Sequence, residues 1–300
     1  MRAPTFWDFL LLTSLAAIWG SAFLAIKITV EDIPPATIAA GRLLVASIVI
    51  YLYMRSRSLS LPRNRKFWQQ IVLVSFFSMA APFAMISWAE QFISSGLTAI
   101  LMATGPLIAL ILSHFFSTDD RFTLFKFLGV LVGFAGVIVV LGLETFSGIG
   151  DNFYAQIITM LAAMCYACSG ILVRRIKEKS NTVVTASILI SATALILPVS
   201  LIFETPWVAI ASSETNSILA LLYLGLIPTA LAFILRFYLI REVGVTFASY
   251  VGYLVPFFGV LWGALFLGER LPSTTIIGLL LILAGIAVSR LHFKKLQKNT

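Results

Sequence analysis

A long apolar stretch with one proline in its middle occurs twice in the sequence, half a chain apart. The first copy, GLTAILMATGPLIALILSHFF, spans Gly96–Phe116, and the second, FASYVGYLVPFFGVLWGALFLGE, spans Phe247–Glu269. Their prolines, Pro106 and Pro256, lie 256 − 106 = 150 residues apart in a chain of 300 residues. Similarity at a fixed spacing indicates one structural unit that is used twice.

Ten apolar runs divide the chain, and its composition places them in lipid. With a mean hydropathy of +1.00 and only 11% charged residues, a water-soluble fold would expose too much apolar surface. A bilayer core of about 30 Å needs roughly 20 apolar residues per helix. The sequence therefore predicts an all-α integral membrane protein with ten transmembrane helices. The runs are Phe6–Ile26, Ala36–Met54, Phe67–Ala89, Gly96–Phe116, Phe125–Leu143, Phe153–Val173, Val183–Phe203, Ser217–Ile240, Phe247–Leu267 and Thr274–Leu291.

Lysine and arginine concentrate on one side of the predicted membrane. All but four of the 21 lie on the side of the two termini; Lys27 and Arg270 lie opposite, and Arg42 and Arg236 lie within runs. By the positive-inside rule, both termini are cytoplasmic. Five runs per half is an odd number, so the second half enters the membrane upside down. This predicts an inverted repeat of two five-helix bundles, residues 1–147 and 148–300. The other side collects Glu31, Asp32, Glu90, Glu144, Asp151, Glu204, Glu214 and Glu269.

Residues that could support catalysis or bind a metal do not form the required sets. Residues 148–151 spell the GxGD motif of intramembrane aspartyl proteases, but no run carries the second aspartate that this chemistry needs. His114 and His292 lack zinc-ligand spacing, and Cys165 and Cys168 are interpreted as small packing residues. The net charge of +8 has no basic and aromatic stripe to bind nucleic acid. We therefore predict a protein that is not an enzyme and that uses no metal, cofactor or nucleic acid.

Three segments resemble a known family of carriers. They are WGSAFLAIK (Trp19–Lys27), AAGRLL around Arg42, and LGERLPSTTIIGLLLILAGI (Leu267–Ile286). They resemble the signature segments of the EamA branch of the drug/metabolite transporter superfamily, and most nearly the YddG-type amino-acid exporters of bacterial inner membranes. The resemblance implies ten spans and export of small organic metabolites. The first half has Thr118–Arg121 where the second has Gly268–Arg270, so that motif is intact only once.

Prolines inside the runs are predicted to bend the helices. Each removes a backbone N–H and frees the carbonyl four residues earlier, which must then face protein or a wet cavity. The bends could serve helix curvature alone or also present carbonyls to a solute, and both interpretations stay open. The prolines assigned to hinges are Pro82, Pro106, Pro228 and Pro256, and the carbonyls they free belong to Ser78, Met102, Leu224 and Gly252.

The ninth run has two different faces at helical spacing. Tyr250 and Tyr253 share one face, and Gly252 lies on the opposite face together with further glycines. Buried tyrosine hydroxyls need partners, so the aromatic face is predicted to line a polar interior, with interhelical packing as the alternative. Glycines spaced four residues apart are predicted to let helices approach closely. These packing glycines are Gly129, Gly133, Gly259 and Gly263.

The predicted substrate site combines aromatic, thioether and small polar groups from several runs. For Trp88 the alternative is a position in the interfacial aromatic belt, and for Arg236 it is snorkelling to the membrane surface. Arg42 is interpreted as structural. No carboxylate lies deep in a run, which argues against a carboxylate proton relay. The predicted substrate-binding residues are Trp19, Phe23, Ser78, Met85, Trp88, Met102, Arg236, Tyr250, Gly252 and Tyr253.

These features together predict a secondary transporter. The chain has no Walker A motif, so transport must use a solute or ion gradient. An aromatic, nearly uncharged cavity suits amino acids, including neutral and aromatic ones, or related small amphipathic metabolites. We predict export by alternating access across the bacterial inner membrane, by a monomer whose partners are its solute and lipid. The alternatives are an exporter of drugs or other metabolites, and a channel.

Overall fold

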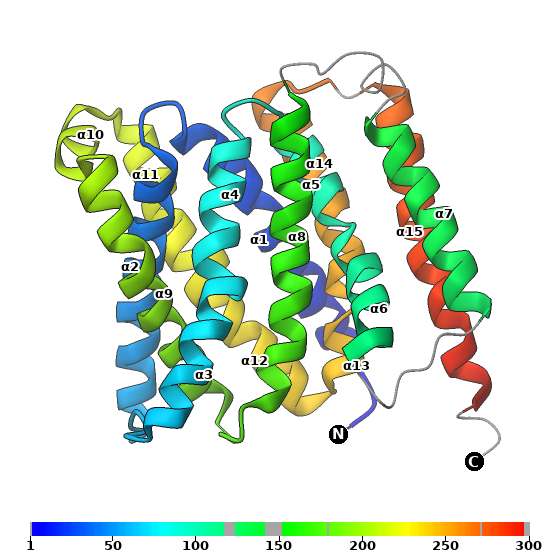
Figure 1. Ribbon diagram of the computed structural model, residues 1–300, viewed down its shortest axis with the longest axis horizontal. Helices are drawn as coiled ribbons and strands as arrows, with labels where there is room; N and C mark the ends of the chain where they lie inside the picture. Colours follow the sequence, from blue (N-terminus) through cyan, green and yellow to red (C-terminus); the bar gives the residue numbers. More distant parts are fainter. Residues whose placement is uncertain (1, 117–123, 142–151, 179, 271, 297–300) are drawn as a thin grey trace.

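The chain folds into a bundle of helices that run up and down beside one another (Figure 1). The computed structural model describes residues 2–116, 124–141, 152–178, 180–270 and 272–296. The helices are α1 (Phe6–Thr29), α2 (Pro35–Ser56), α3 (Arg65–Ser75), η1 (Phe76–Ala80), α4 (Ala81–Ala89), α5 (Ser95–Met102), α6 (Gly105–Phe116), α7 (Leu124–Leu141), α8 (Phe153–Leu172), η3 (Val173–Arg175), α9 (Asn181–Phe203), α10 (Pro206–Ser212), α11 (Thr215–Leu224), η4 (Gly225–Leu231), α12 (Ala232–Glu242), α13 (Val245–Ala248), α14 (Val251–Leu267) and α15 (Ser273–Leu296).

Every predicted apolar run contains helix. Within the described residues, seven helical segments are long and apolar enough to cross a membrane. These are Phe6–Thr29, Pro35–Ser56, Arg65–Ala89, Ser95–Leu112, Phe153–Leu172, Asn181–Phe203 and Thr215–Glu242. Three shorter apolar helices, Phe127–Val139, Val251–Leu267 and Ser273–Val288, fall in the fifth, ninth and tenth predicted runs. The all-helical class is confirmed, and ten crossings remain a prediction.

The third and eighth runs are each bent by a π-helical turn beside a proline. The turn η1 ends two residues before Pro82, and η4 contains Pro228. A π turn admits the proline ring, which clashes with the carbonyl four residues earlier in a regular α-helix. The two turns begin 225 − 76 = 149 residues apart, close to the spacing of Pro106 and Pro256. Corresponding helices of the two halves are therefore bent at the same place. The proline positions predicted the bends but not that they are π turns.

The fourth and ninth runs are interrupted on the N-terminal side of their prolines. Helix α5 ends before α6 begins, and Pro106 is the second residue of α6, where a missing N–H costs little. In the ninth run α13 and α14 are separate helices, and Pro256 lies inside α14. The bends were expected at the prolines. In the fourth run the break, at Ala103 and Thr104, lies directly before the turn that contains Pro106. In the ninth run it lies at Ser249 and Tyr250, too far from Pro256 for the proline to cause it.

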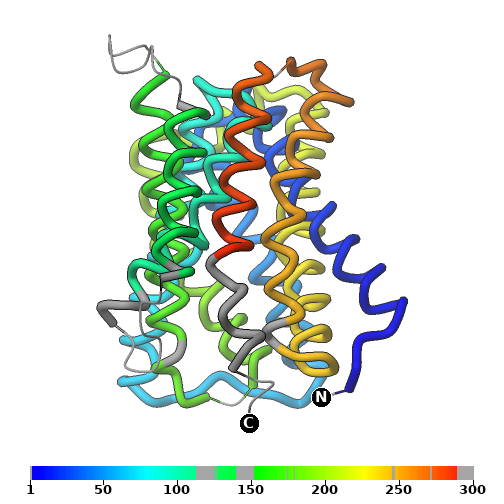
Figure 2. The backbone as a smooth tube through the Cα atoms, turned by 90° about the vertical axis from the view of Figure 1, so that its right-hand side faces the viewer, coloured from blue at the N-terminus to red at the C-terminus, as the bar shows by residue number. Residues whose placement is uncertain are grey.

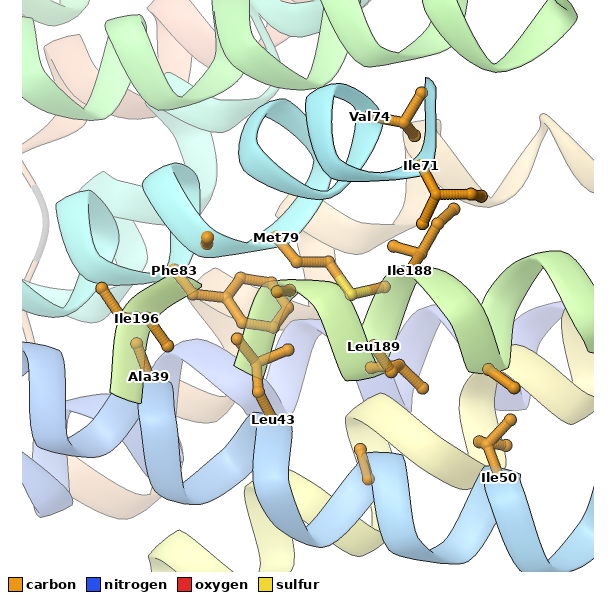
Figure 3. Close-up of a cluster of buried hydrophobic side chains, with 14 of the residues drawn as sticks. Ala39, Leu43, Ile50, Ile71, Val74, Met79, Phe83, Ile188, Leu189 and Ile196 are labelled. Carbon is orange, nitrogen blue, oxygen red and sulfur yellow. The ribbon is translucent and has the colours of Figure 1, made fainter. Parts of the chain in front are cut away.

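A buried apolar cluster joins the two halves along α2, α9 and the α3–η1–α4 segment. Figure 3 shows Phe83 of α4 and Leu43 of α2 pointing toward each other, with Met79 and Leu189 beside them. Leu43 and Leu189 are fully buried. Because lipid is as apolar as these side chains, their contribution comes from close packing rather than from removal of apolar surface from water.

Contacts between the halves occur in exchanged pairs. The first-half helix α4 packs on α8, and its second-half counterpart α12 packs on α1; in the same way α3 packs on α8, and its counterpart α11 packs on α1. Likewise α5 and α6 pack on α8, while α14 packs on α1. Helices α2 and α9, which are counterparts of each other, pack together. An exchanged pattern of this kind is what a two-fold relation between two like units produces.

Helices α7 and α15 pack on each other through glycine at the side of the bundle (Figures 1 and 2). A Cβ atom at Gly136 would lie 2.7 Å from the carbonyl oxygen of Gly278, and one at Gly285 would meet the carbonyl oxygen of Gly129. The sequence repeat aligns Gly129 with Gly278 and Gly136 with Gly285. Gly136 thus meets Gly278, and their counterparts Gly285 and Gly129 meet each other, so the contacts are exchanged here too. The two helices run antiparallel. Gly133 also lies in this contact, against Gly285.

Candidate functional site

The π turn η4 in the second half is held by two side chains from the first half. The indole Nε1 of Trp19 donates to the carbonyl oxygen of Pro228 at 3.1 Å, and Nε of Arg42 donates to Oγ1 of Thr229 at 3.0 Å. Thr229 itself donates to the carbonyl oxygen of Leu224 at 2.7 Å. That carbonyl is the one that Pro228 leaves without its helical partner. The freed carbonyl of Leu224 therefore has a partner within the protein: Arg42 donates to the Thr229 hydroxyl, and this hydroxyl donates to the carbonyl.

Arg42 is buried at the boundary between the halves, with 5% of its surface exposed. Its Cζ lies 3.8 Å from the centroid of the Phe83 ring, within the range of a cation–π contact. Its two Nη atoms have no hydrogen-bond partner among the described residues. Unlike the Ser78 hydroxyl, these atoms are not fully sealed from solvent. The contact with Thr229 is structural, as predicted for Arg42, but it uses only one edge of the guanidinium.

Three of the predicted substrate residues come together in one cluster. Phe23 of α1, Met85 of α4 and Met102 of α5 belong to one cluster, against which Tyr166 of α8 also packs. Tyr166 lies close enough to Arg42 to act on its charge. The cluster therefore combines aromatic and thioether side chains from both halves, and Tyr166 links it to the surroundings of Arg42.

The other predicted substrate residues are divided among different neighbours. Trp88 and Tyr253 pack against a second cluster, which contains residues of α5 and α15. The rings of Tyr253 and Tyr250 are 6.4 Å apart, but Tyr250 is exposed. Arg236 is exposed, and its Cζ lies 5.9 Å from the ring of Trp19. The structure thus places the predicted residues in three groups rather than on one continuous wall.

Two small residues of the predicted site lie in contrasting surroundings. The Ser78 hydroxyl, in the π turn η1, is sealed from solvent and has no hydrogen-bond partner among the described residues. A Cβ atom at Gly252 would meet nothing within 4 Å, so Gly252 borders open space rather than a packed helix. On the same helix, Gly259 lies against Ala99, and Gly263 lies against Ser95 and Glu269. The glycine face of α14 is therefore packed in its later turns and open in its first.

Carboxylates bind the starts of helices in the opposite half at one end of the bundle. Glu269 accepts hydrogen bonds from the first two N–H groups of α5, at 2.8 and 2.9 Å. Glu204 accepts from the first two N–H groups of α2, those of Ala36 and Thr37, at 3.0 and 2.6 Å. Asp32 accepts from the Ser217 hydroxyl at 2.5 Å and from the backbone N–H of Glu214 at 3.1 Å. Helix N-termini favour negative charge, so each contact stabilises this end of the bundle. We call Asp32, Glu204 and Glu269 the bridging carboxylates.

Glu90 lies at the same end, and its surroundings differ from those expected. The sequence placed it among the acidic residues of the loops, but its side chain is fully buried and neither carboxylate oxygen has a hydrogen-bond partner among the described residues. Lys27 Nζ donates instead to the Glu90 backbone carbonyl at 2.6 Å. Glu90 follows the Arg65–Ala89 span, and burial raises the pKa of its carboxyl well above the usual range, although nearby Lys27 opposes this. A buried acid is therefore present where the sequence indicated a solvated one.

A groove of about 290 Å³ opens between α1 and α11. Leu24, Ile28 and Leu219 line it, and Ser21 and Tyr223, whose hydroxyl oxygens are 2.6 Å apart, lie in it. None of the predicted substrate residues lines this groove. Its lining residues Ala25, Ala220 and Tyr223 also belong to, or pack against, the cluster of Phe23, Met85 and Met102.

Some predictions fall on parts of the chain that the structure does not describe. These are the GxGD motif at residues 148–151, the boundary between residues 147 and 148, the segment 118–121 and the side chains of His114 and His292. Cys165 is buried in α8, Cys168 is half-buried, and both are free thiols. Among the described residues, no group of three or more His, Cys, Asp or Glu could hold a metal ion.

Comparisons with known proteins identify the family. The sequence profile of the EamA-like transporter family matches residues 5–142 and again residues 153–291. The chain is 24% identical over 285 residues to the uncharacterized transporter YoaV of Bacillus subtilis, covering 94% of this chain and 96% of YoaV. It is 28% identical over 263 residues to the uncharacterized inner membrane transporter YedA of Escherichia coli K12, covering 87% of this chain and 83% of YedA. A solved crystal structure with 19% identity matches with a TM-score of 0.68 over 97% of this chain and 99% of its own, which shows the shared fold. This multi-pass membrane protein therefore belongs to the EamA-like transporter family, with two copies of the family's repeat.

Proposed function

We propose that the protein is a secondary transporter that exports small amphipathic solutes, amino acids above all, by alternating access between two inverted repeats. We place it in the bacterial inner membrane, with both termini cytoplasmic and the bridging carboxylates at the outer end. The charge asymmetry of the loops supports this orientation. The exchanged helix contacts and the exchanged glycine contacts of α7 and α15 support the inversion.

The bridging carboxylates are the observation on which the alternating-access proposal chiefly rests. All three connect one half with the other, and all three lie at one end of the bundle. Contacts that lie between two rigid units at one end are those that must break when the units rock apart there. We therefore interpret this structure as a state that is closed to the outside, and its outer end as the gate that releases the solute.

The surroundings of Arg42 support a small amphipathic solute. The cluster of Phe23, Met85 and Met102 offers apolar contact, while Arg42 is a buried guanidinium and Glu90 a buried carboxyl group. A zwitterion with an apolar side chain has matching chemistry. The remaining predicted substrate residues, including Tyr253 and Trp88, would contact the solute in other states of the cycle.

Exchange across proteoliposomes tests this function. Vesicles loaded with unlabelled phenylalanine should accumulate labelled phenylalanine transiently above equilibrium, because the excess of unlabelled solute inside competes with the labelled solute for outward transport. The rate should saturate with concentration, and vesicles without protein are the control. Labelled solute that only equilibrates, at a rate that rises linearly with concentration, would indicate a channel. The absence of protein-dependent uptake for all tested neutral amino acids would contradict the substrate class.

A further inference from the structure

We propose that Arg42 binds the carboxylate group of the transported solute. This inference rests on the proposed transport function and makes it more specific, because it assigns one chemical group of the solute to one side chain. It also replaces the purely structural role that the sequence suggested for Arg42.

The orientation of the guanidinium leaves one edge free. Thr229 accepts from Nε at 3.0 Å, and Cζ lies over the Phe83 ring, 3.8 Å from its centroid (Figure 3 shows the Phe83 ring beside α2). These contacts hold the side chain from its Nε side and from one face. A guanidinium has five N–H donors, so four remain on the Nη atoms. They keep a small accessible surface, so the free edge is the one from which a ligand would bind.

The charge of Arg42 also lacks a counterion in this state. Arginine stays protonated in proteins, so burial cannot be relieved by loss of its proton. Glu90 acts on the charge of Arg42, but no ion pair joins the two side chains among the described residues. A buried charge without a partner is costly, and folded proteins normally supply one. An anion that arrives with the solute and leaves with it would complete the site only when the transporter is loaded.

The surroundings favour a carboxylate over other anions. The two Nη atoms and a carboxylate match as a pair of parallel hydrogen bonds. Phosphate groups carry more charge and usually need several Lys or Arg residues, whereas the neighbours of Arg42 include Phe83 and Tyr166. Phe23 and Met85 extend the apolar surface from there. The geometry therefore suits a monoanionic carboxylate that is attached to an apolar body.

Competition in the proteoliposome exchange assay tests the assignment. Phenylalanine and phenylalanine amide differ only at the carboxylate. Against the wild type, the amide should compete at least about tenfold more weakly than the acid, because a charge-assisted pair is worth roughly 1.5–3 kcal/mol, or about 10–100-fold. Arg42→Gln should raise the apparent KM for phenylalanine about tenfold or more. The same variant should change the inhibition constant of the amide by less than about threefold.

Controls separate binding from folding. Arg241→Gln removes an arginine that is exposed and pairs with Glu242, and it should leave the discrimination unchanged. If Arg42→Gln does not fold, the wild type still decides the matter, since phenylalanine should raise its Tm in detergent and the amide should not. Equal competition and equal Tm shifts for acid and amide would overturn the role of Arg42 while leaving the transport function intact. A wild type that exchanges neither compound would instead overturn the proposed function, and this inference with it.

Discussion

The variant Gly259→Leu is expected to yield almost no folded protein, whereas Gly252→Leu on the same helix should fold. A Cβ at Gly259 would overlap the Cβ of Ala99 in α5, and Ala99 has no flexible side chain that could move away. Relief would require a shift of the α5 or α14 backbone, which costs more than the roughly 1–3 kcal/mol typical of overpacked cores. The yield of monodisperse protein in size-exclusion chromatography measures the effect.

Gly252→Leu is a matched control for this comparison. The two positions are seven residues apart, so they lie on the same face of α14 after two turns. A Cβ at Gly252 meets nothing within 4 Å, so the added side chain has room. Equal yields for the two variants would mean that α14 does not pack on α5 through Gly259.

The variant Glu269→Gln is expected to open the outer end of the protein more often. It removes the negative charge that α5 binds through its first two N–H groups, a charge-assisted contact worth roughly 1.5–3 kcal/mol. A loss of this size shifts an equilibrium about tenfold or more. Ser95→Cys provides the readout, because Ser95 is fully buried beneath Glu269. The thiol that Ser95→Cys introduces should react about ten times faster with a membrane-impermeant maleimide when Glu269→Gln is also present.

Glu214→Gln is the control for Glu269→Gln. Glu214 lies at the same end of the bundle, and its backbone N–H and carbonyl form hydrogen bonds, whereas its carboxylate forms none with the described residues. Glu214→Gln should leave the labelling of Ser95→Cys unchanged, and Cys165 and Cys168 are replaced with alanine in all variants. If Glu269→Gln labels no faster than Glu214→Gln, the bridging carboxylates do not hold the outer end closed.

The sequence predicted the helical class and the repeat because both are encoded locally. Apolar runs of about 20 residues specify helices in lipid, and the alignment of Gly129 with Gly278 is visible in the printed residues. The π turns were missed because a proline indicates that a helix must adapt but not how it adapts. Pro82 and Pro228 are accommodated by π turns, whereas Pro106 lies in the first turn of a new helix.

The candidate site could be predicted only in part because it depends on contacts between distant residues. Phe23, Met85 and Met102 do lie in one cluster, but Tyr253 and Trp88 pack elsewhere. Helical periodicity tells which residues share a face and not which helix that face meets. The partners of Arg42 and Glu269 are 187 and 174 residues away in the chain. For Arg42 one signal was available, since Thr229 directly follows a mid-run proline and can bond the freed carbonyl.

A reversible cross-link between α2 and α9 tests most directly whether the outer end must open during transport. The hydroxyl oxygens of Thr37 and Ser200 are 2.8 Å apart, and both residues are buried beside Glu204. Cysteines at these two positions can therefore form a disulfide with little movement. In proteoliposomes, oxidation of Thr37→Cys/Ser200→Cys should stop phenylalanine exchange, and reduction should restore it, while each single variant keeps its rate under the same treatment. An oxidised, fully cross-linked protein that exchanges phenylalanine as fast as the reduced one would contradict alternating access through this end.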